Sequence, residues 1–203
     1  LAAHSRYGKL GARTVARLAR NSGLQLTGPL CMSVKELSDS IREVLKEKSS
    51  IIVLWGLVDD GLEAIRELRK QGYSGLICGG DGLASPAFFA QKTVPVEGVV
   101  VTCPYDLQED SPANWKFREA FRKRFSTEPD SFSAHSYDTM NLLAQALKNS
   151  DGTRSGLRDA LASGNEYVGV TGSLQFDASG NDRRPVRLAV CHEGALNILP
   201  DLP

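Results

Sequence analysis

The sequence predicts an α/β protein built on a doubly wound parallel sheet. Three observations carry the prediction: a β-α-β unit within residues 50–82, an alternation of helix and strand patterns from residue 9 to residue 103, and a change of character after residue 104. Such alternation builds parallel sheets, whose ligands bind beyond the carboxyl ends of the strands.

The central unit has the clearest pattern. Ile51–Trp55 is a short continuous apolar run, typical of a strand buried on both faces. A helix follows in which apolar residues recur at helical spacing from 62 to 68, and Gly72 is expected to end it. Ser74–Cys78 is predicted to be a second buried strand, so the two strand ends are the first place to look for a site.

The segment before this unit is expected to hold two helices. A helix is predicted over Lys9–Ser22, followed by a strand-like return over Leu24–Ser33. Ser33–Glu36 has the pattern of a capping box that opens the next helix. The residues expected to face inward are Leu10, Val15 and Leu18 in the first helix and Val34, Leu37, Ile41, Val44 and Leu45 in the second.

The alternation continues to residue 103 but begins on a helix. Ser85 and Pro86 are placed as the N-cap and first residue of a short helix, and Val96–Cys103 is predicted to be a buried strand. The strand that should precede the first helix is expected to lie before Leu1, or to be only partly kept in residues 1–3. Since the chain also opens without Met, we expect it to be part of a longer product.

Beyond residue 104 the pattern becomes mainly helical. A helix is predicted after Ser111, then a long one, then a short one over Thr153–Ser163. Two closing strands, Tyr167–Phe176 and Val186–Cys191, are expected to be joined by a turn and followed by a short tail. The long helix is expected to face inward with Tyr137, Met140, Leu143, Ala144 and Leu147.

Composition excludes several classes of protein. The 203 residues carry 24 acidic and 24 basic side chains, so the whole-chain charge gives no sign of a nucleic-acid or anionic-membrane partner. No apolar run approaches the roughly 20 residues of a membrane span. The four cysteines are widely spaced in apolar segments and are expected to be buried free thiols: Cys31, Cys78, Cys103 and Cys191.

Motifs for catalysis and cofactors are missing from the sequence. It contains no GxSxG, SxxK, Walker A or GxGxxG pattern, and its three histidines lie in unrelated segments without metal spacing. We therefore expect no cofactor and no metal. A small α/β hydrolase, with Asp81 and His135 as acid and base, is the remote alternative.

Asp81 is the most informative polar residue. It follows a predicted buried strand within Gly79–Gly82, where glycines would let a ligand approach the backbone. Its carboxylate is expected to cap the helix near Ser85, to coordinate a cation, or to accept a hydrogen bond from a ligand's ammonium group. Asp60, three residues before Glu63, is expected to be an ordinary N-cap.

Five segments in order resemble bacterial leucine/isoleucine/valine-binding proteins, the type I periplasmic solute receptors of ABC importers. The resemblance extends over nearly the whole chain and is specific for the superfamily rather than for the ligand. The segments are Ser5–Lys9, Gly79–Gly82, Phe121–Pro129, Ser136–Asp138 and Gly169–Gly180.

The resemblance implies two α/β lobes that close on a solute by a hinge motion. It assigns residues 1–103, with 185–203 returning, to the second lobe, and residues 104–184 to the C-terminal segment of the first lobe. The ligand side of the second lobe in this family uses an aromatic residue near a Tyr-Gly pair, a residue after the strand matching Ile51–Trp55, and an acid. The matching ligand-binding positions here are Tyr7, Leu57 or Val58, and Asp81.

The function implied by the resemblance is non-catalytic binding of a branched-chain amino acid or a related small amino or carboxylic compound. The implied partner is the membrane permease of an ABC importer. The expected location is the periplasm or, in a Gram-positive host, the extracellular face of the membrane. The alternative of the same fold is a ligand-sensing domain, such as a receptor ectodomain or an amide sensor.

Overall fold

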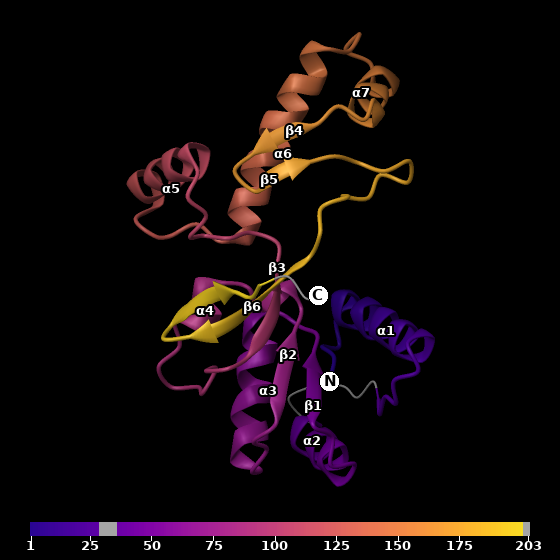
Figure 1. Cartoon of the computed structure of the whole chain (residues 1–203), viewed down its shortest axis with the longest axis vertical. Helices are drawn as coiled ribbons and strands as arrows, with labels where there is room; N and C mark the ends of the chain where they lie inside the picture. Colours follow the sequence, from indigo (N-terminus) through magenta and orange to yellow (C-terminus); the bar gives the residue numbers. More distant parts are fainter. Residues whose placement is uncertain (29–35, 201–203) are drawn as a thin grey trace. The chain divides into compact units, whose positions relative to one another are not determined.

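The computed structural model describes residues 1–28 and 36–200, and the chain divides into two compact units (Figure 1). Unit 1 consists of Leu1–Cys103 and Arg187–Pro203, and unit 2 of Pro104–Val186. Cys31, Val34 and the expected capping box from Ser33 lie outside the described residues, as does part of the expected strand from Leu24. Residues 24–28 of that segment form no strand.

A five-stranded sheet forms the centre of unit 1. Its order is β1-β2-β3-β6-β7; β1, β2 and β3 are parallel, whereas β6 runs antiparallel to β3 and β7 antiparallel to β6. The predicted α/β class with a parallel-rich sheet is confirmed. The strands are β1 (Ile51–Leu54), β2 (Leu76–Gly79), β3 (Val100–Cys103), β6 (Arg187–His192) and β7 (Ala195–Ile198).

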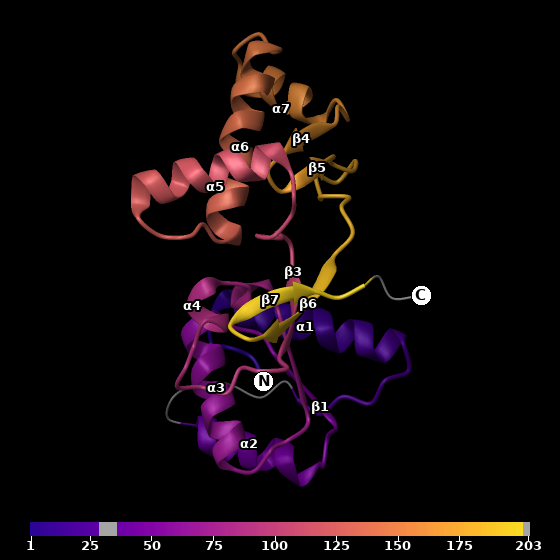
Figure 2. The same cartoon turned by 60° about the vertical axis from the view of Figure 1, so that its left-hand side comes forward.

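Helices cover both sides of this sheet. α2 (Leu37–Lys46) lies beside α3 (Val58–Lys70), and α1 (Arg6–Asn21) lies on the other side of the strands (Figure 2). The 3₁₀ turn η1 (Asp81–Leu83) and the short α4 (Pro86–Phe89) follow β2. Fully buried side chains from strands and helices meet in the core, among them Ile41, Leu54, Ile65, Leu68, Ile77, Leu83, Phe88 and Val101.

The first three residues continue the sheet beyond β1. Trp55 N–H donates to the Leu1 carbonyl at 2.9 Å, and Ala3 N–H donates to the Trp55 carbonyl at 2.8 Å. Ala2 and Trp55 thus form a parallel bridge.

Unit 2 is mainly helical. It contains α5 (Pro112–Phe125), α6 (Ser131–Lys148), α7 (Arg154–Ala162) and the antiparallel pair β4 (Tyr167–Gly169) and β5 (Gly172–Leu174). A small core in this unit is formed by Tyr105, Phe117 of α5, Ala134 of α6 and Val170 after β4. The buried Asp138 of α6 accepts hydrogen bonds from the backbone of Val170 and Thr171 at 2.8 Å each, which fixes the β4–β5 turn to the helix. None of the helices within the described residues is long and apolar enough to span a membrane.

The predicted inward faces of two helices are wrong. On α1, Leu10 and Leu18 are 51% and 54% exposed, because the helix packs through the small residues Gly8, Gly11 and Ala19 instead. On α6, Ala134, Asp138 and Ala146 face inward. The expected inward residues Tyr137, Met140, Ala144 and Leu147 are exposed.

The predicted strand arrangement near the C-terminus is also corrected. Residues 167–174 form a hairpin of two short strands, because Gly172 has φ +97 and allows a tight turn after Gly169. β6 pairs with β3 rather than with that segment, and the expected tail is strand β7. In β1, Ile51 is 52% exposed, so this strand is not buried on both faces.

Three cysteines lie in the described part of the sheet. Cys103 and Cys191 are buried, as predicted, and Cys78 is half-buried. Burial raises the pKa of the Cys191 thiol to about 12, so this side chain behaves as a small hydrophobic residue.

Candidate functional site

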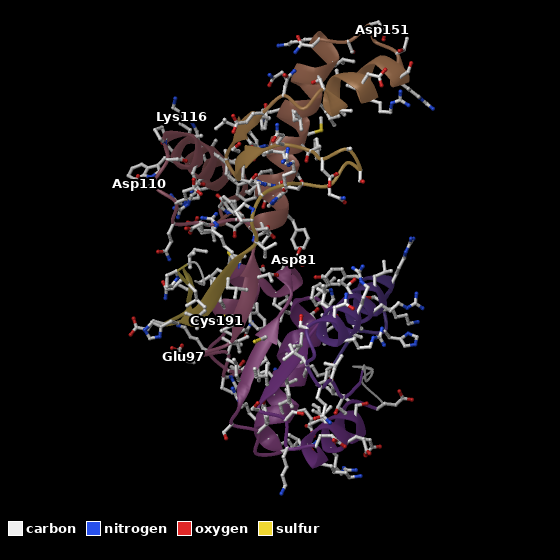
Figure 3. The ribbon with its side chains drawn as sticks, turned by 45° about the vertical axis from the view of Figure 1, so that its right-hand side comes forward. Asp81, Glu97, Asp110, Lys116, Asp151 and Cys191 are labelled. Atoms are coloured by element: carbon white, nitrogen blue, oxygen red, sulfur yellow. The ribbon has the colours of Figure 1, made fainter. Side chains whose placement is uncertain are left out.

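The structure brings the four predicted site residues to one region of unit 1. β1 and β2 are parallel neighbours, with Leu54 opposite Gly79, so both strands end at the same edge of the sheet. Leu57 and Val58 lie at the start of α3, just after β1, and Asp81 begins η1, just after β2. Figure 3 shows Asp81 at this end of unit 1.

Tyr7 reaches this edge from the first turn of α1. The Ser5 side chain caps that helix by accepting from Gly8 N–H at 3.2 Å, which fixes where the helix begins. The Tyr7 hydroxyl then donates to Asp81 Oδ1 at 2.7 Å, across 74 positions of sequence. This contact joins two segments that were singled out separately in the sequence.

The Tyr7 hydroxyl is held from a second side. It accepts a hydrogen bond from Gly82 N–H at 3.2 Å. Burial, and then the hydrogen bond to Asp81, raise the pKa of Tyr7 well above its usual value. The phenol therefore stays protonated at neutral pH and remains a donor to the carboxylate.

Trp55 supports Tyr7 from within the unit. The two rings are 6.0 Å apart between centroids and inclined by 43°. α1 can approach the indole because residue 11 is glycine: a Cβ there would lie 2.1 Å from Trp55 Nε1. The Tyr7 ring thus packs near the indole of Trp55, a contact that no local sequence pattern indicates.

Leu57 supplies an apolar side chain beside Asp81. It is 51% exposed, and its Cδ2 would lie 3.2 Å from a Cβ at position 82. Val58, the first residue of α3, is half-buried. Of the two alternatives at this position, Leu57 therefore offers the larger accessible surface.

Glycines around Asp81 were expected to let a ligand approach the backbone. At Gly82 this expectation is wrong. A Cβ there would lie 2.5 Å from the Gly56 carbonyl oxygen and 3.1 Å from the Tyr7 hydroxyl. The space at residue 82 is filled by the protein's own chain. Gly82 is needed so that the ends of β1 and β2 and the start of α1 can pack together.

Among the expected caps, Ser85 is confirmed, whereas the capping roles of Asp60 and Asp81 are corrected. Asp60 is not the N-cap of α3 but its third residue, and its Oδ2 accepts from Leu57 N–H at 3.0 Å. The helix α4 is capped by Ser85, which accepts from Ala87 N–H at 3.3 Å. Asp81 is therefore left without a capping role at α4.

The remote acid–base pair is not assembled within one unit. Asp81 belongs to unit 1 and His135 to unit 2. His135 Nδ1 lies 2.7 Å from the Ser131 carbonyl oxygen, so that nitrogen donates its hydrogen within α6. Among the described residues no group of three His, Cys, Asp or Glu side chains is arranged to hold a metal ion.

The resulting arrangement suits a small ligand with a positive charge next to an apolar group. Asp81 is exposed, and within residues 1–28 and 36–200 its carboxylate has no cationic partner. One of its oxygens is held by Tyr7, so the group is oriented before a ligand arrives. The exposed Leu57 side chain and the Tyr7 ring provide apolar surface nearby.

Comparison with known proteins defines the class. A model of the periplasmic binding protein family matches residues 1–191, and the chain belongs to this family. Members of the family are solute-binding proteins. A comparison with curated protein sequences finds no match.

Solved structures give the same fold. The chain is similar to a leucine-binding protein of Thermotoga maritima, with a TM-score of 0.86 and 20% identity over 97% of this chain and 57% of that one. It is also similar to an ABC transporter substrate-binding protein of Desulfitobacterium hafniense in complex with leucine, with a TM-score of 0.71 and 25% identity over 98% and 58%.

A third similar structure was solved with a different ligand. It is a solute-binding protein of an ABC transporter of R. palustris in complex with benzoate, with a TM-score of 0.78 and 16% identity over 97% of this chain and 56% of that one. The chain therefore spans less than two thirds of the length of these relatives. Together the matches confirm the type I periplasmic-binding-protein fold and the predicted resemblance.

Proposed function

We propose that this chain is part of the extracytoplasmic solute-binding component of an ABC importer, and that its ligand is a branched-chain amino acid or a related small amino compound. The observation that carries the proposal is the exposed Asp81 carboxylate, oriented by Tyr7 at 2.7 Å and lying beside the exposed Leu57. Asp81 would hold the ligand's ammonium group through a charge-assisted hydrogen bond.

In this proposal unit 1 is the second lobe and unit 2 is the C-terminal part of the first. The ligand's carboxylate would be held by first-lobe groups, and contacts to both lobes would stabilise a closed state. The partner would be the membrane permease of the importer, and the location periplasmic or extracellular. Binding would be non-catalytic and would need no cofactor.

A ligand-sensing domain of the same fold remains the second candidate, since it would use the same site. A carboxylate ligand without an amine is a third possibility within the family, because one similar structure holds benzoate. An exposed, uncompensated Asp81 argues against such a ligand at this position, since two like charges would repel each other.

The ligand class is tested by comparing three compounds that share a branched aliphatic group. These are leucine, 3-methylbutylamine, which keeps only the amine, and 4-methylpentanoate, which keeps only the carboxylate. Each is titrated into the isotope-labelled chain, and backbone amide shifts are followed by NMR. Because the proposed unit 1 site recognises only the ammonium end, leucine and the amine should shift the amides of Leu57 and Gly82 at millimolar concentrations, and the acid should not.

A response to 4-methylpentanoate but not to the amine would contradict the ammonium assignment and favour a carboxylate ligand. Shifts confined to other parts of unit 1 would show that the site lies elsewhere.

A further inference from the structure

One helix of unit 1 carries positive charge that nothing nearby balances. The 16 residues of α1 include four arginines and one lysine but no acidic residue. All five cations are exposed: Arg6, Lys9, Arg13, Arg17 and Arg20. Figure 3 shows nitrogen-tipped side chains fanning out from this indigo helix.

The five cations share one face of α1. Their spacings of three and four residues place them within an arc of about 80° at 3.6 residues per turn. From Arg6 to Arg20 the row extends roughly 21 Å along the axis. The opposite face is buried through Gly8, Gly11 and Ala19. The result is a straight, narrow cationic row, here called the α1 row.

The cations of α2 form ion pairs, and those of α1 do not. On α2, Arg42 pairs with Asp39 at 2.7 Å and Lys46 with Glu43 at 2.9 Å. By contrast, no member of the α1 row forms an ion pair or a side-chain hydrogen bond with any residue in the described ranges 1–28 and 36–200. The zero net charge of the whole chain therefore conceals a local excess of about five positive charges.

Exposed leucines accompany the α1 row. Leu10 lies about 20° outside the cationic arc at 3.6 residues per turn and is 51% exposed, whereas Leu18, which is 54% exposed, lies about 100° outside it, on the side of Gly11. Just beyond the helix, Leu24 is 66% exposed. A cationic helix face bordered by an exposed leucine is a feature of helices that lie at a membrane interface, where leucines enter the acyl boundary and arginines contact phosphates.

We propose that the α1 row binds the surface of an anionic phospholipid bilayer. Four of its five cations are arginines, whose planar guanidinium groups match phosphate oxygens. A straight row matches a flat surface, and the exposed leucines add an apolar contact that an acidic protein patch or a nucleic acid would not need. This proposal departs from the expectation, drawn from net charge alone, that the chain gives no electrostatic sign of an anionic-membrane partner.

The test is co-sedimentation of the chain with vesicles of phosphatidylcholine alone, or of phosphatidylcholine and phosphatidylglycerol in equal parts. The chain should sediment with the anionic vesicles only, and binding should fall as salt rises from about 0.1 M to about 0.5 M. Arg13→Gln with Arg17→Gln should weaken binding by about tenfold or more, since each cation near an anionic surface contributes roughly a factor of five. Leu10→Ser should also weaken it.

The matched control is Lys116→Gln with Lys123→Gln on α5, where both lysines are exposed and the change of charge is the same. These variants should bind like the parent, and circular dichroism should show that all of them keep their fold. Equal binding to both kinds of vesicle, or an equal loss in the α5 control, would overturn the proposal. If the leucine variant binds normally and polyglutamate or duplex DNA displaces the chain, the row is a general polyanion surface and the lipid proposal fails.

Discussion

At the scale of single residues, the geometry of the site depends on the Tyr7 hydroxyl. It donates to Asp81 and accepts from Gly82 N–H, so a single oxygen ties the start of α1 to the end of β2. The aromatic ring was expected to contact a ligand. The structure adds that the hydroxyl orients the carboxylate, a role that residue type alone does not reveal.

Replacing this hydroxyl tests its role. Tyr7→Phe should lower the free energy of unfolding by about 1 kcal/mol, because two partners lose a hydrogen bond. It should also weaken binding of 3-methylbutylamine by about fivefold, since Asp81 is no longer fixed. Chemical denaturation and NMR titration measure the two effects.

The control is Tyr73→Phe. The Tyr73 hydroxyl donates to the carbonyls of Ser50 and Leu76 at 3.0 Å each, away from the site. Tyr73→Phe should lower the free energy of unfolding by a similar amount and leave the binding of 3-methylbutylamine unchanged. If Tyr7→Phe binds the amine as the parent does, Tyr7 has no positioning role.

At the scale of helices and strands, the sequence predicts the position and the buried residues of an element where apolar residues follow a strong local pattern. α2 and α3 lie where periodicity placed them, with Ile41, Val44, Ile65 and Leu68 buried. The sequence also predicted Asp81 as the residue of interest, because a strand end with glycines is a recognisable local signal.

The errors have one physical cause: long-range packing decides which face of an amphipathic element is inside. α1 turns small residues inward because Gly11 must fit against Trp55, and no local pattern records that contact. Likewise, the hydrogen bond from Tyr7 to Asp81 joins residues 74 positions apart. Pairing of β6 with β3 is equally non-local.

Glu97, in the loop before β3, contacts the turn of the β6–β7 hairpin in addition to the backbone hydrogen bonds that join this loop to β6. Glu97 accepts from Glu193 N–H at 3.1 Å and forms a close ion pair with His192 (Figure 3 labels Glu97). The hydrogen bond to Glu97 raises the pKa of His192, and the same contact lowers the pKa of Glu97. Both groups are charged, and the ion pair is complete, when the pH lies between the pKa of Glu97 and the pKa of His192. The ion pair is lost as the pH rises through the pKa of His192.

Glu97→Gln should therefore lower the pKa of His192 towards the ordinary histidine value. NMR titration of the imidazole protons measures this directly. Glu193→Gln is the control, because Glu193 contributes only a weaker electrostatic effect, and it should lower the pKa of His192 much less. An unchanged pKa in Glu97→Gln would show that the ion pair does not form in solution.

At the scale of the molecule, the two units differ in how well they are packed. Most of the buried apolar side chains belong to the sheet and helices of unit 1, whereas the core cluster of unit 2 is small and lies around Phe117. Large apolar side chains remain exposed in unit 2, such as Met140 at 66% and Val168 at 74%. The proposed site residues all come from the better-packed unit, so their geometry has a rigid support.

The most direct test of the central claim is the binding of 3-methylbutylamine to Asp81→Asn. This change keeps the shape of the side chain and removes its charge, and Asp59→Asn, at an exposed acid near the same strand ends, is the matched control. Because Asp81 is exposed in this chain, the variant should bind the amine about three- to fivefold more weakly by NMR titration, and Asp59→Asn should bind it normally. Its thermal unfolding without ligand should match that of the parent. Unchanged binding in Asp81→Asn would contradict the claim that this carboxylate holds the ligand's ammonium group.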